Sequence, residues 1–170
     1  MNPLISVITL THNKLEVTRK CLSSWLQTRY APWELIVVEN HSTDGTREWL
    51  KAYASEAERA GVRLRVIHNA RNAGCSTARN QGIGKAAGDK LVFMDNDVAL
   101  YDRDWMVQLA SCLDANPKVG IVGPKLVYPF PPYAIQCAGV GISRSGACGS
   151  AAAASPRMIC GSIAARMSNA

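Results

Sequence analysis

Short apolar segments rich in β-branched residues alternate along this chain with segments of helical periodicity, and this alternation restricts the folds open to it. The predicted strands cover residues 4–10, 33–38, 64–67, 90–94 and 119–122. Helices are predicted over 14–28, from a cap at Ser42 or Thr43 to Gly61, over 77–87 and over 105–113. Strands that alternate with helices form βαβ units. We therefore predict an α/β fold, a three-layer α/β/α domain with a mostly parallel central sheet.

Polar loops follow the first four predicted strands. In a parallel sheet the carboxyl ends of the strands lie at one edge, and ligands bind in the crevice outside that edge. The polar clusters are Thr11-His12-Asn13, Glu39-Asn40, Asn72-Ala73-Gly74 and Asp95-Asn96-Asp97. The sequence therefore predicts a ligand site built from four loops.

Two carboxylates one residue apart, Asp95 and Asp97, end the fourth predicted strand. In an extended chain, residues i and i+2 face the same side, so both carboxylates can face one point. Two like charges so close are costly unless something neutralises them. A hard divalent cation does so, and Mg²⁺ typically takes one or two protein carboxylates together with substrate phosphates. A metal site that holds a nucleoside diphosphate is the first interpretation.

Two other interpretations of the acidic pair stay open at this point. Haloacid-dehalogenase-like phosphatases also place a D-x-D after an apolar strand and use the first Asp as a covalent nucleophile. Their motif follows the first strand and further acidic ligands come much later, whereas no acidic residue follows Asp114 here. The third interpretation is an acidic turn without a chemical role.

The loop of residues 39–46 and the segment around Arg79 are the other candidates for ligand contact. We expect Ser42 or Thr43 to cap the following helix and Asp44 to favour its dipole, which leaves Glu39 and Asn40 free to contact a ligand. Backbone amides near Asn72 and Gly74, together with Arg79 near a helix start, suit an anion. A solvent-facing Arg79 on an amphipathic helix is the alternative.

Composition limits the classes of partner and the compartment. The 170 residues are 48% hydrophobic and 19% charged, which is typical of a globular protein. The chain has no membrane-length apolar run and no secretory signal, and its six cysteines show no C-x-x-C spacing, so we expect a reduced, cytoplasmic protein. The net charge is +6, but the five basic residues after Asp114 are spread over 56 positions and form no patch, so no nucleic-acid partner is expected.

Four segments together resemble the nucleotide-binding half of family 2 glycosyltransferases, which have the Rossmann-like GT-A fold. They are SVITLTHNK (6–14), ELIVVENHSTDGT (34–46), NARNAGCSTARNQGIGKAAGD (69–89) and LVFMDNDV (91–98). Agreement in order, spacing and residue type extends over roughly residues 4–127. The resemblance implies a nucleotide-sugar-binding domain over 1–127, followed over 128–170 by an incomplete or diverged acceptor-side segment that is partly irregular. We expect a strand over 134–142 and loop or partial disorder beyond Ser143.

The resemblance also implies roles for individual residues. Asp97, with Asp95, would hold Mn²⁺ or Mg²⁺ on the diphosphate of the donor. Glu39 stands where the family usually has Asp, which leaves the preferred nucleobase open. The residues implied in binding the nucleotide sugar are Thr9, Thr11, Asn13, Glu39, Asn40, Asn72, Gly74, Arg79, Asp95 and Asn96.

The predicted reaction is sugar transfer, with inversion, from a metal-bound nucleotide-diphosphate sugar to an acceptor hydroxyl. An inverting transfer needs a general base, which the family supplies as an acidic residue well after the D-x-D. No such residue follows Asp114, so the alternative is a catalytically incomplete nucleotide-binding fragment. The acceptor is an unknown carbohydrate or a lipid-linked sugar, and the second of these would place the protein at the inner face of the membrane.

Overall fold

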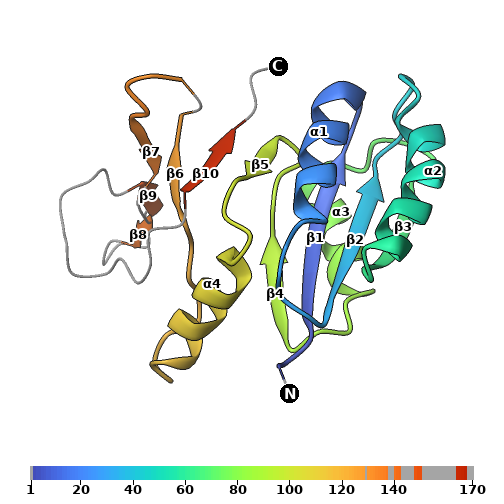
Figure 1. Cartoon of the computed structure of the whole chain (residues 1–170). Helices are drawn as coiled ribbons and strands as arrows, with labels where there is room; N and C mark the ends of the chain where they lie inside the picture. The colour runs from blue at the N-terminus through green and yellow to red at the C-terminus, as the bar shows by residue number, and fades with distance from the viewer. Residues whose placement is uncertain (1, 129, 138–139, 143–147, 151–163, 168–170) are drawn as a thin grey trace. The chain divides into compact units, whose positions relative to one another are not determined.

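The computed structural model describes residues 2–128, 130–137, 140–142, 148–150 and 164–167 (Figure 1). The chain forms two compact units, the first reaching to Asp97 and the second beginning at Val98. The two units are described separately below. In the part of the chain that the structure describes, no helix has both the length and the apolar character needed to cross a membrane.

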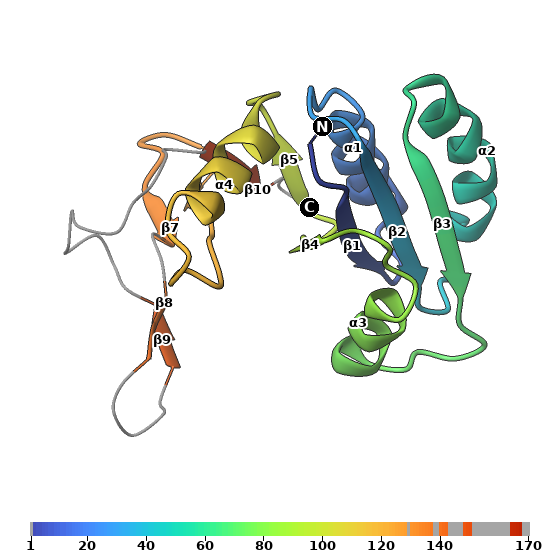
Figure 2. The same cartoon turned by 90° about the horizontal axis from the view of Figure 1, so that it is seen from below.

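The first unit contains a four-stranded parallel sheet in the order β3-β2-β1-β4. Its strands are β1 (Ile5–Thr11), β2 (Trp33–Glu39), β3 (Arg63–His68) and β4 (Lys90–Phe93). Its helices are α1 (Leu15–Trp25), α2 (Thr46–Arg59) and α3 (Cys75–Ile83). Figure 2 shows α1 and α2 on one face of the sheet and α3 on the other. The predicted three-layer α/β/α arrangement with a parallel sheet is confirmed.

The two central strands form the core of this unit. All seven residues of β2 are buried, as are six of the seven in β1. Strands covered on both faces are expected to be continuous apolar runs, and the IVV of β2 and the VI of β1 fit this. Leu22 and Trp25 of α1, and Leu50 and Tyr53 of α2, are also buried.

The opposite face of the sheet is closely approached by α3. A Cβ atom on Gly82 would lie 2.5 Å from Cγ2 of Ile8, a distance that real Cβ atoms do not show. Only a glycine therefore lets the helix reach this depth on β1. The helix ends at Ile83 rather than at the predicted residue 87. Gly88 lies instead against the start of β1, where a Cβ would be 2.7 Å from the carbonyl oxygen of Leu4.

The predicted cap of the second helix is wrong. The N-cap of α2 is Gly45, with φ of 91°, and neither Ser42 nor Thr43 caps the helix. The reason is that Asp44 takes over the local bonding, because its Oδ1 accepts hydrogen bonds from the amide (3.1 Å) and the hydroxyl (2.6 Å) of Thr46. Likewise α1 ends at Trp25, three residues before its predicted end.

The described residues of the second unit form one helix and short strands. These are β5 (Val98–Leu100), α4 (Trp105–Asp114), β6 (Lys125–Val127), β7 (Ile135–Cys137), β8 (Val140–Ile142), β9 (Cys148–Ser150) and β10 (Ala164–Met167). One sheet has the order β5-β10-β6-β7, with β10 parallel to β6, and β8 pairs with β9 in a separate antiparallel ribbon.

Sequence-based prediction was less successful in this second unit. The strand expected over 119–122 is wrong: this stretch has no regular structure, Ile121 is 91% exposed, and the next strand is β6. Glycines at 120 and 123 and a proline at 124 interrupt the short apolar run. The single strand expected over 134–142 is two strands, β7 and β8, with different partners.

The expectation of loop or partial disorder beyond Ser143 is wrong where β9 and β10 lie, and elsewhere it falls outside the described residues. Neither strand has the length or the alternation that would mark it in the sequence, so each is defined by its pairing, β9 with the preceding strand β8 and β10 with the distant strands β5 and β6.

Candidate functional site

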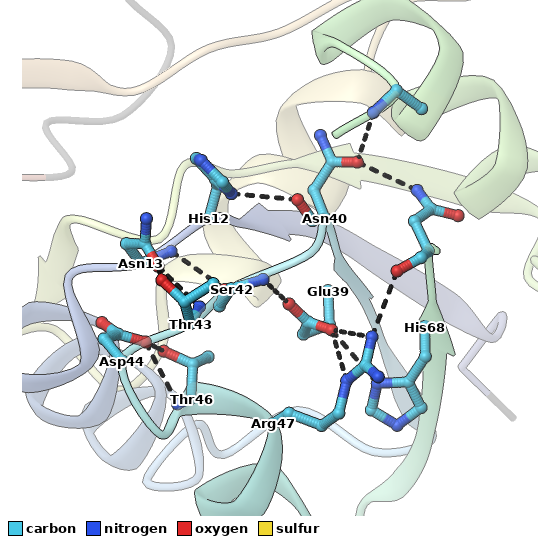
Figure 3. A network of polar contacts seen from close by, with 12 residues as sticks. His12, Asn13, Glu39, Asn40, Ser42, Thr43, Asp44, Thr46, Arg47 and His68 are labelled. Carbon is cyan, nitrogen blue, oxygen red and sulfur yellow. Dashed lines mark hydrogen bonds and ion pairs between the residues drawn. The ribbon is translucent and has the colours of Figure 1, made fainter. Parts of the chain in front are cut away.

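The loops that follow β1 and β2 at the carboxyl edge of the sheet are joined by hydrogen bonds (Figure 3). The amide of Asn13 donates to Oγ of Ser42 at 2.9 Å, and the amide of Thr43 donates to Oδ1 of Asn13 at 2.9 Å. His12 contributes a third contact, between its Nδ1 and the carbonyl oxygen of Asn40 at 2.9 Å. Asn13 has a positive φ of 59°, which asparagine adopts more readily than most residues. The loops after β1 and β2 therefore form a single hydrogen-bonded structure.

Glu39, the last residue of β2, is fully buried and both of its carboxylate oxygens are occupied. Oε1 accepts a hydrogen bond from the amide of Ser42, and Oε2 is 2.9 Å from both Nε and Nη2 of Arg47. Nδ1 of His68 lies 3.4 Å from Oε2. Burial alone would raise the pKa of Glu39, but the bonds from Ser42, Arg47 and His68 outweigh it and lower that pKa below its usual value.

The expectation that Glu39 is free to contact a ligand is therefore wrong, because its charge is already used inside the protein. Arg47 extends the same connection by donating from Nη2 to the carbonyl oxygen of Asn69 at 3.1 Å. Glu39 thus joins the loop after β2, the first turn of α2 and the end of β3. Its implied role in binding the nucleoside stays a prediction, and any such role would be exerted through these neighbours.

Asn40 is also engaged, and by uncharged partners. Its Oδ1 accepts from Nδ2 of Asn69 (3.0 Å) and from the amide of Ala73 (2.9 Å), and its Nδ2 donates to Oδ1 of Asn72 (2.7 Å). Asn72 Oδ1 also accepts from the amide of Gly74, which precedes α3 with φ of 77°. The expectation that the Asn40 side chain is free is wrong for the same reason as for Glu39. This amide network fixes the loop of residues 69–74 that leads into α3.

Asp44 joins the starts of two helices. Its Oδ2 accepts from the amide of Leu15 at 2.8 Å, and its Oδ1 accepts from Thr46. Partial burial would raise the pKa of Asp44, but the bonds from Thr46 and Leu15 lower it overall. A charged Asp44 therefore stabilises the amino ends of both α1 and α2, as the positive end of a helix dipole favours.

The acidic pair lies just beyond β4, but not in an extended segment. Asn96 and Asp97 lie in a turn, so the strand alternation used to predict a common direction for the two carboxylates does not apply. Oδ1 of Asp95 accepts from Nη2 of Arg79 at 2.9 Å, with the Asp95 side chain largely exposed and the Arg79 side chain half-buried. Nδ2 of Asn96 donates to Oγ1 of Thr18, on α1, at 2.7 Å. Arg79, predicted to suit an anion, is thus paired with a carboxylate of the chain itself, and its contact with a ligand stays a prediction.

One oxygen of Asp97 differs from all the others in this turn. Its Oδ1 is buried and has no hydrogen-bond partner among the described residues, and Oγ1 of Thr9 on β1 shares this condition. A buried acceptor without a partner costs about 1–3 kcal/mol, so an external partner for Asp97 would be stabilising. A carboxylate oxygen is the kind of ligand atom that Mg²⁺ and Mn²⁺ prefer.

Few side chains near Asp97 could serve as further ligands of a metal ion. Within the described ranges, no group of three or more His, Cys, Asp or Glu side chains is placed to hold a metal ion. These residues therefore fit a cation held by one or two carboxylates together with oxygens of a bound ligand, and not a cation enclosed by protein.

Several residues of this edge were missed by sequence reasoning, notably Thr18, Arg47 and Asn69. Thr18 could have been noticed, because it is a polar residue on the face of α1 that otherwise buries Cys21, Leu22 and Trp25. Arg47 and Asn69 gave no such signal, since their partners lie 8 and 22 residues away and only the fold brings them together.

Comparison with known proteins assigns the family. The sequence model of glycosyl transferase family 2 matches residues 6–135. This chain belongs to glycosyltransferase family 2. It is 36% identical over 149 residues to the uncharacterized protein y4gI of Sinorhizobium fredii, which covers 86% of this chain and 16% of y4gI. It is 36% identical over 95 residues to the putative teichuronic acid biosynthesis glycosyltransferase TuaG of Bacillus subtilis, which covers 56% of this chain and 36% of TuaG.

Solved structures agree with this assignment. The mannosyltransferase PcManGT of Pyrobaculum calidifontis, solved with GDP-Man and Mn²⁺, matches with a TM-score of 0.64 and 27% identity over 71% of this chain and 34% of PcManGT. TarS of S. aureus, solved with UDP, matches with a TM-score of 0.57 at 24% identity, over 73% of this chain and 34% of the TarS chain, and supports the fold alone. The GT-A fold is therefore confirmed. The chain spans less than half the length of each of these relatives.

Proposed function

We propose that this domain binds a nucleotide-diphosphate sugar together with Mn²⁺ or Mg²⁺ and transfers the sugar to an acceptor hydroxyl with inversion. The observation that carries the proposal is the buried Oδ1 of Asp97, which has no hydrogen-bond partner within the described part of the chain, at the carboxyl edge of a parallel sheet. Its relative PcManGT, 27% identical, was solved with GDP-Man and Mn²⁺, which supports the same class of donor and cation here.

In this proposal, different residues of the chain contact different parts of the nucleotide-sugar donor. Asp97 holds the cation, and Asp95, fixed by Arg79, lies next to the donor phosphates. Thr9 offers a buried hydroxyl that has no hydrogen bond to the described residues, and Thr11 and Asn13 follow it at the same edge. The loop of Asn72 and Gly74 leads into α3 and shapes the site, since its Ala73 and Gly74 amides already donate to Asn40 and Asn72. When bound, the cation stabilises the negative charge of the leaving diphosphate.

Glu39 and Asn40 contribute by fixing the loops. Glu39 joins the loop after β2 to α2, and Asn40 joins it to the loop before α3. Holding a bound substrate in one geometry lowers the entropic cost of reaction. The general base for the acceptor hydroxyl is not assigned to any residue of this chain. The acceptor class that we propose is a carbohydrate or a lipid-linked sugar, the latter at the inner face of the membrane.

Calorimetric titration tests the proposal. UDP, GDP and dTDP are each titrated into the protein with Mn²⁺ and with EDTA, and the same titrations are run on Asp97→Asn. We expect one nucleotide to bind in Mn²⁺, with binding lost or strongly weakened in EDTA and in Asp97→Asn. Absence of binding for all three nucleotides, or equal binding by Asp97→Asn, would overturn the assignment of the site.

Turnover separates a transferase from the alternative, a nucleotide-binding fragment without a general base. Release of the nucleoside diphosphate from UDP-, GDP- and dTDP-sugars is followed with simple sugars as acceptors. Donor consumption that depends on acceptor supports transfer. Metal-dependent binding without any consumption of donor across a panel of acceptors would support the fragment.

A further inference from the structure

The side chain of Thr18 is fully buried on the sheet-facing side of α1, where the other buried residues are Cys21, Leu22 and Trp25. Its amide donates to the carbonyl oxygen of Lys14 within the helix, so the backbone needs nothing from the hydroxyl. The hydroxyl instead makes two long-range contacts. Oγ1 accepts from Nδ2 of Asn96 at 2.7 Å and lies 3.2 Å from Oγ1 of Thr11.

These contacts link three side chains through one hydroxyl. An amide nitrogen can only donate, so Asn96 donates to Thr18, and the contact between the Thr18 and Thr11 hydroxyls can have either of them as the donor. Thr11 is the last residue of β1 and is buried. The middle residue of the acidic turn is therefore anchored to the sheet through one hydroxyl of α1.

The acidic turn is thereby held on two sides. Asp95 is paired with Arg79 of α3, on one face of the sheet, and Asn96 is bonded to Thr18 of α1, on the other face (Figure 2). Asp97 follows directly, with its buried Oδ1 unpaired among the described residues. Since Asn96 is covalently joined to both aspartates, fixing its side chain limits the directions that the Asp97 carboxylate can take.

We propose that Thr18 is a positioning residue for the cation-binding carboxylate of Asp97 and that it acts through Asn96. The proposal rests on the proposed function, because it assumes that Asp97 holds a divalent cation. Residues that orient metal ligands typically change metal affinity by roughly 10- to 100-fold when they are removed. An effect near the lower end of this range is expected here, because Thr18 bonds to Asn96 and not to Asp97 itself.

The test compares Thr18→Val with Thr18→Ser. Valine has the shape of threonine without the hydroxyl, whereas serine keeps the hydroxyl and loses a methyl group. Mn²⁺ is titrated calorimetrically into each protein in the presence of whichever of UDP, GDP or dTDP the wild type binds. We expect Thr18→Val to weaken the apparent Mn²⁺ affinity by about tenfold. Thr18→Ser should stay within about twofold of wild type, since it retains the hydrogen bond.

Leu22→Val is the control for a general loosening of α1, because it removes one methylene from the same buried face without touching the turn. It should lower the melting temperature and leave the Mn²⁺ affinity unchanged. A second readout uses the metal-free protein: the side-chain amide protons of Asn96, observed by ¹H–¹⁵N NMR, should shift and exchange faster in Thr18→Val only.

The outcomes separate the two proposals. If the wild type binds no nucleotide with Mn²⁺, the proposed function fails and the role of Thr18 fails with it. If the wild type binds with Mn²⁺ and Thr18→Val binds equally well, only the positioning role is overturned. An equal loss in Thr18→Val, Thr18→Ser and Leu22→Val would also overturn it, because that result would reflect packing of α1 and not the hydroxyl.

Discussion

A buried carboxylate at the end of β2 keeps its charge because three residues bond to it. Glu39 is bonded to the Ser42 amide, to two nitrogens of Arg47 and, more distantly, to His68. Taking a carboxylate out of water is costly, and these partners repay the cost only while the group stays ionised. The hydrogen bonds that Glu39 makes at the carboxyl edge of the sheet therefore depend on pH.

The first prediction concerns Glu39→Gln. The glutamine amide has one acceptor oxygen and no charge, so it cannot accept from both Arg47 and the Ser42 amide, and we expect the free energy of unfolding at pH 7 to fall by about 1–3 kcal/mol in urea denaturation. Glu16→Gln, which removes an exposed ion pair with Arg19, should change it by less than about 0.5 kcal/mol. Equal effects of the two substitutions would show that the Glu39 contacts contribute nothing specific.

The pH dependence follows from the direction of the shift. The folded pKa of Glu39 lies below the ordinary value of 4.5, so its contribution is fully present above pH 4.5 and is lost as the pH falls through the folded pKa. Glu34 and Asp44 also have lowered pKa values and contribute to the same loss. Stability measured from pH 6 to pH 3 should therefore fall less steeply in Glu39→Gln than in wild type.

A second prediction at this scale concerns the unpaired oxygen of Asp97. Without metal, Asp97→Asn should leave the free energy of unfolding unchanged or raise it, because a buried charged acceptor without a partner is removed. In saturating Mn²⁺ and nucleotide the order should reverse, since the ligands stabilise only the wild type. Thermal melts with and without ligands measure both. Destabilisation of the metal-free variant would show that Asp97 is a structural residue.

At the scale of elements, the depth at which α3 lies on β1 depends on Gly82. In Gly82→Ala the new methyl group would meet Cγ2 of Ile8 at 2.5 Å, so the helix must move outward, at a typical cost of about 1–3 kcal/mol. Gly84→Ala is the matched control. Gly84 has a helical φ of −64°, and a Cβ there would meet its nearest atoms at 3.6 Å. It should be neutral or slightly stabilising in the same denaturation experiment.

The elements of the first unit could be predicted from the sequence, because each carries its own signal. Strands β1 to β4 are short apolar runs, helices α1 to α3 have helical periodicity, and the alternation of the two predicts parallel strands. The bonds of Glu39 and Asn40 could not be predicted, since the partners of the Asn40 side chain and His68 beside Glu39 lie about thirty residues away, and nothing in the sequence shows that Ser42 and Arg47 take the oxygens of Glu39. The polar edge was therefore found, but the division between ligand-binding and structural side chains was not.

At the scale of the whole molecule, the chain consists of two units of different construction. The central strands of the first unit each pair on both sides, whereas most strands of the second are three residues long. Sequence prediction was weaker for the second unit because such short strands owe their existence to pairing and carry little periodicity. The family resemblance implies a functional boundary after residue 127, between a nucleotide-sugar-binding part and an acceptor-side part, and this boundary stays a prediction. The division into compact units falls elsewhere in the chain, between Asp97 and Val98.

Hydrogen exchange tests this difference. We expect the backbone amides of β1 and β2 to exchange far more slowly than those of β5, β6 and β7, because their bonds open only with the core of the first unit. Native-state exchange followed by mass spectrometry in increasing urea measures both sets. Matching protection in the two sets would mean that the two units unfold as one cooperative body.

The loop before α3 is held by Asn40, Asn69 and Asn72, none of which carries a charge. Amide groups do not titrate in the physiological range, and bonds between neutral groups are little affected by ionic strength. This loop should therefore keep one shape from mildly acid to mildly basic buffers and from low to high salt. Any sensitivity of ligand binding to such conditions would then arise in the charged or ionisable groups around this loop, which include His12, Glu39 and Arg47, in the acidic turn or in the ligand itself.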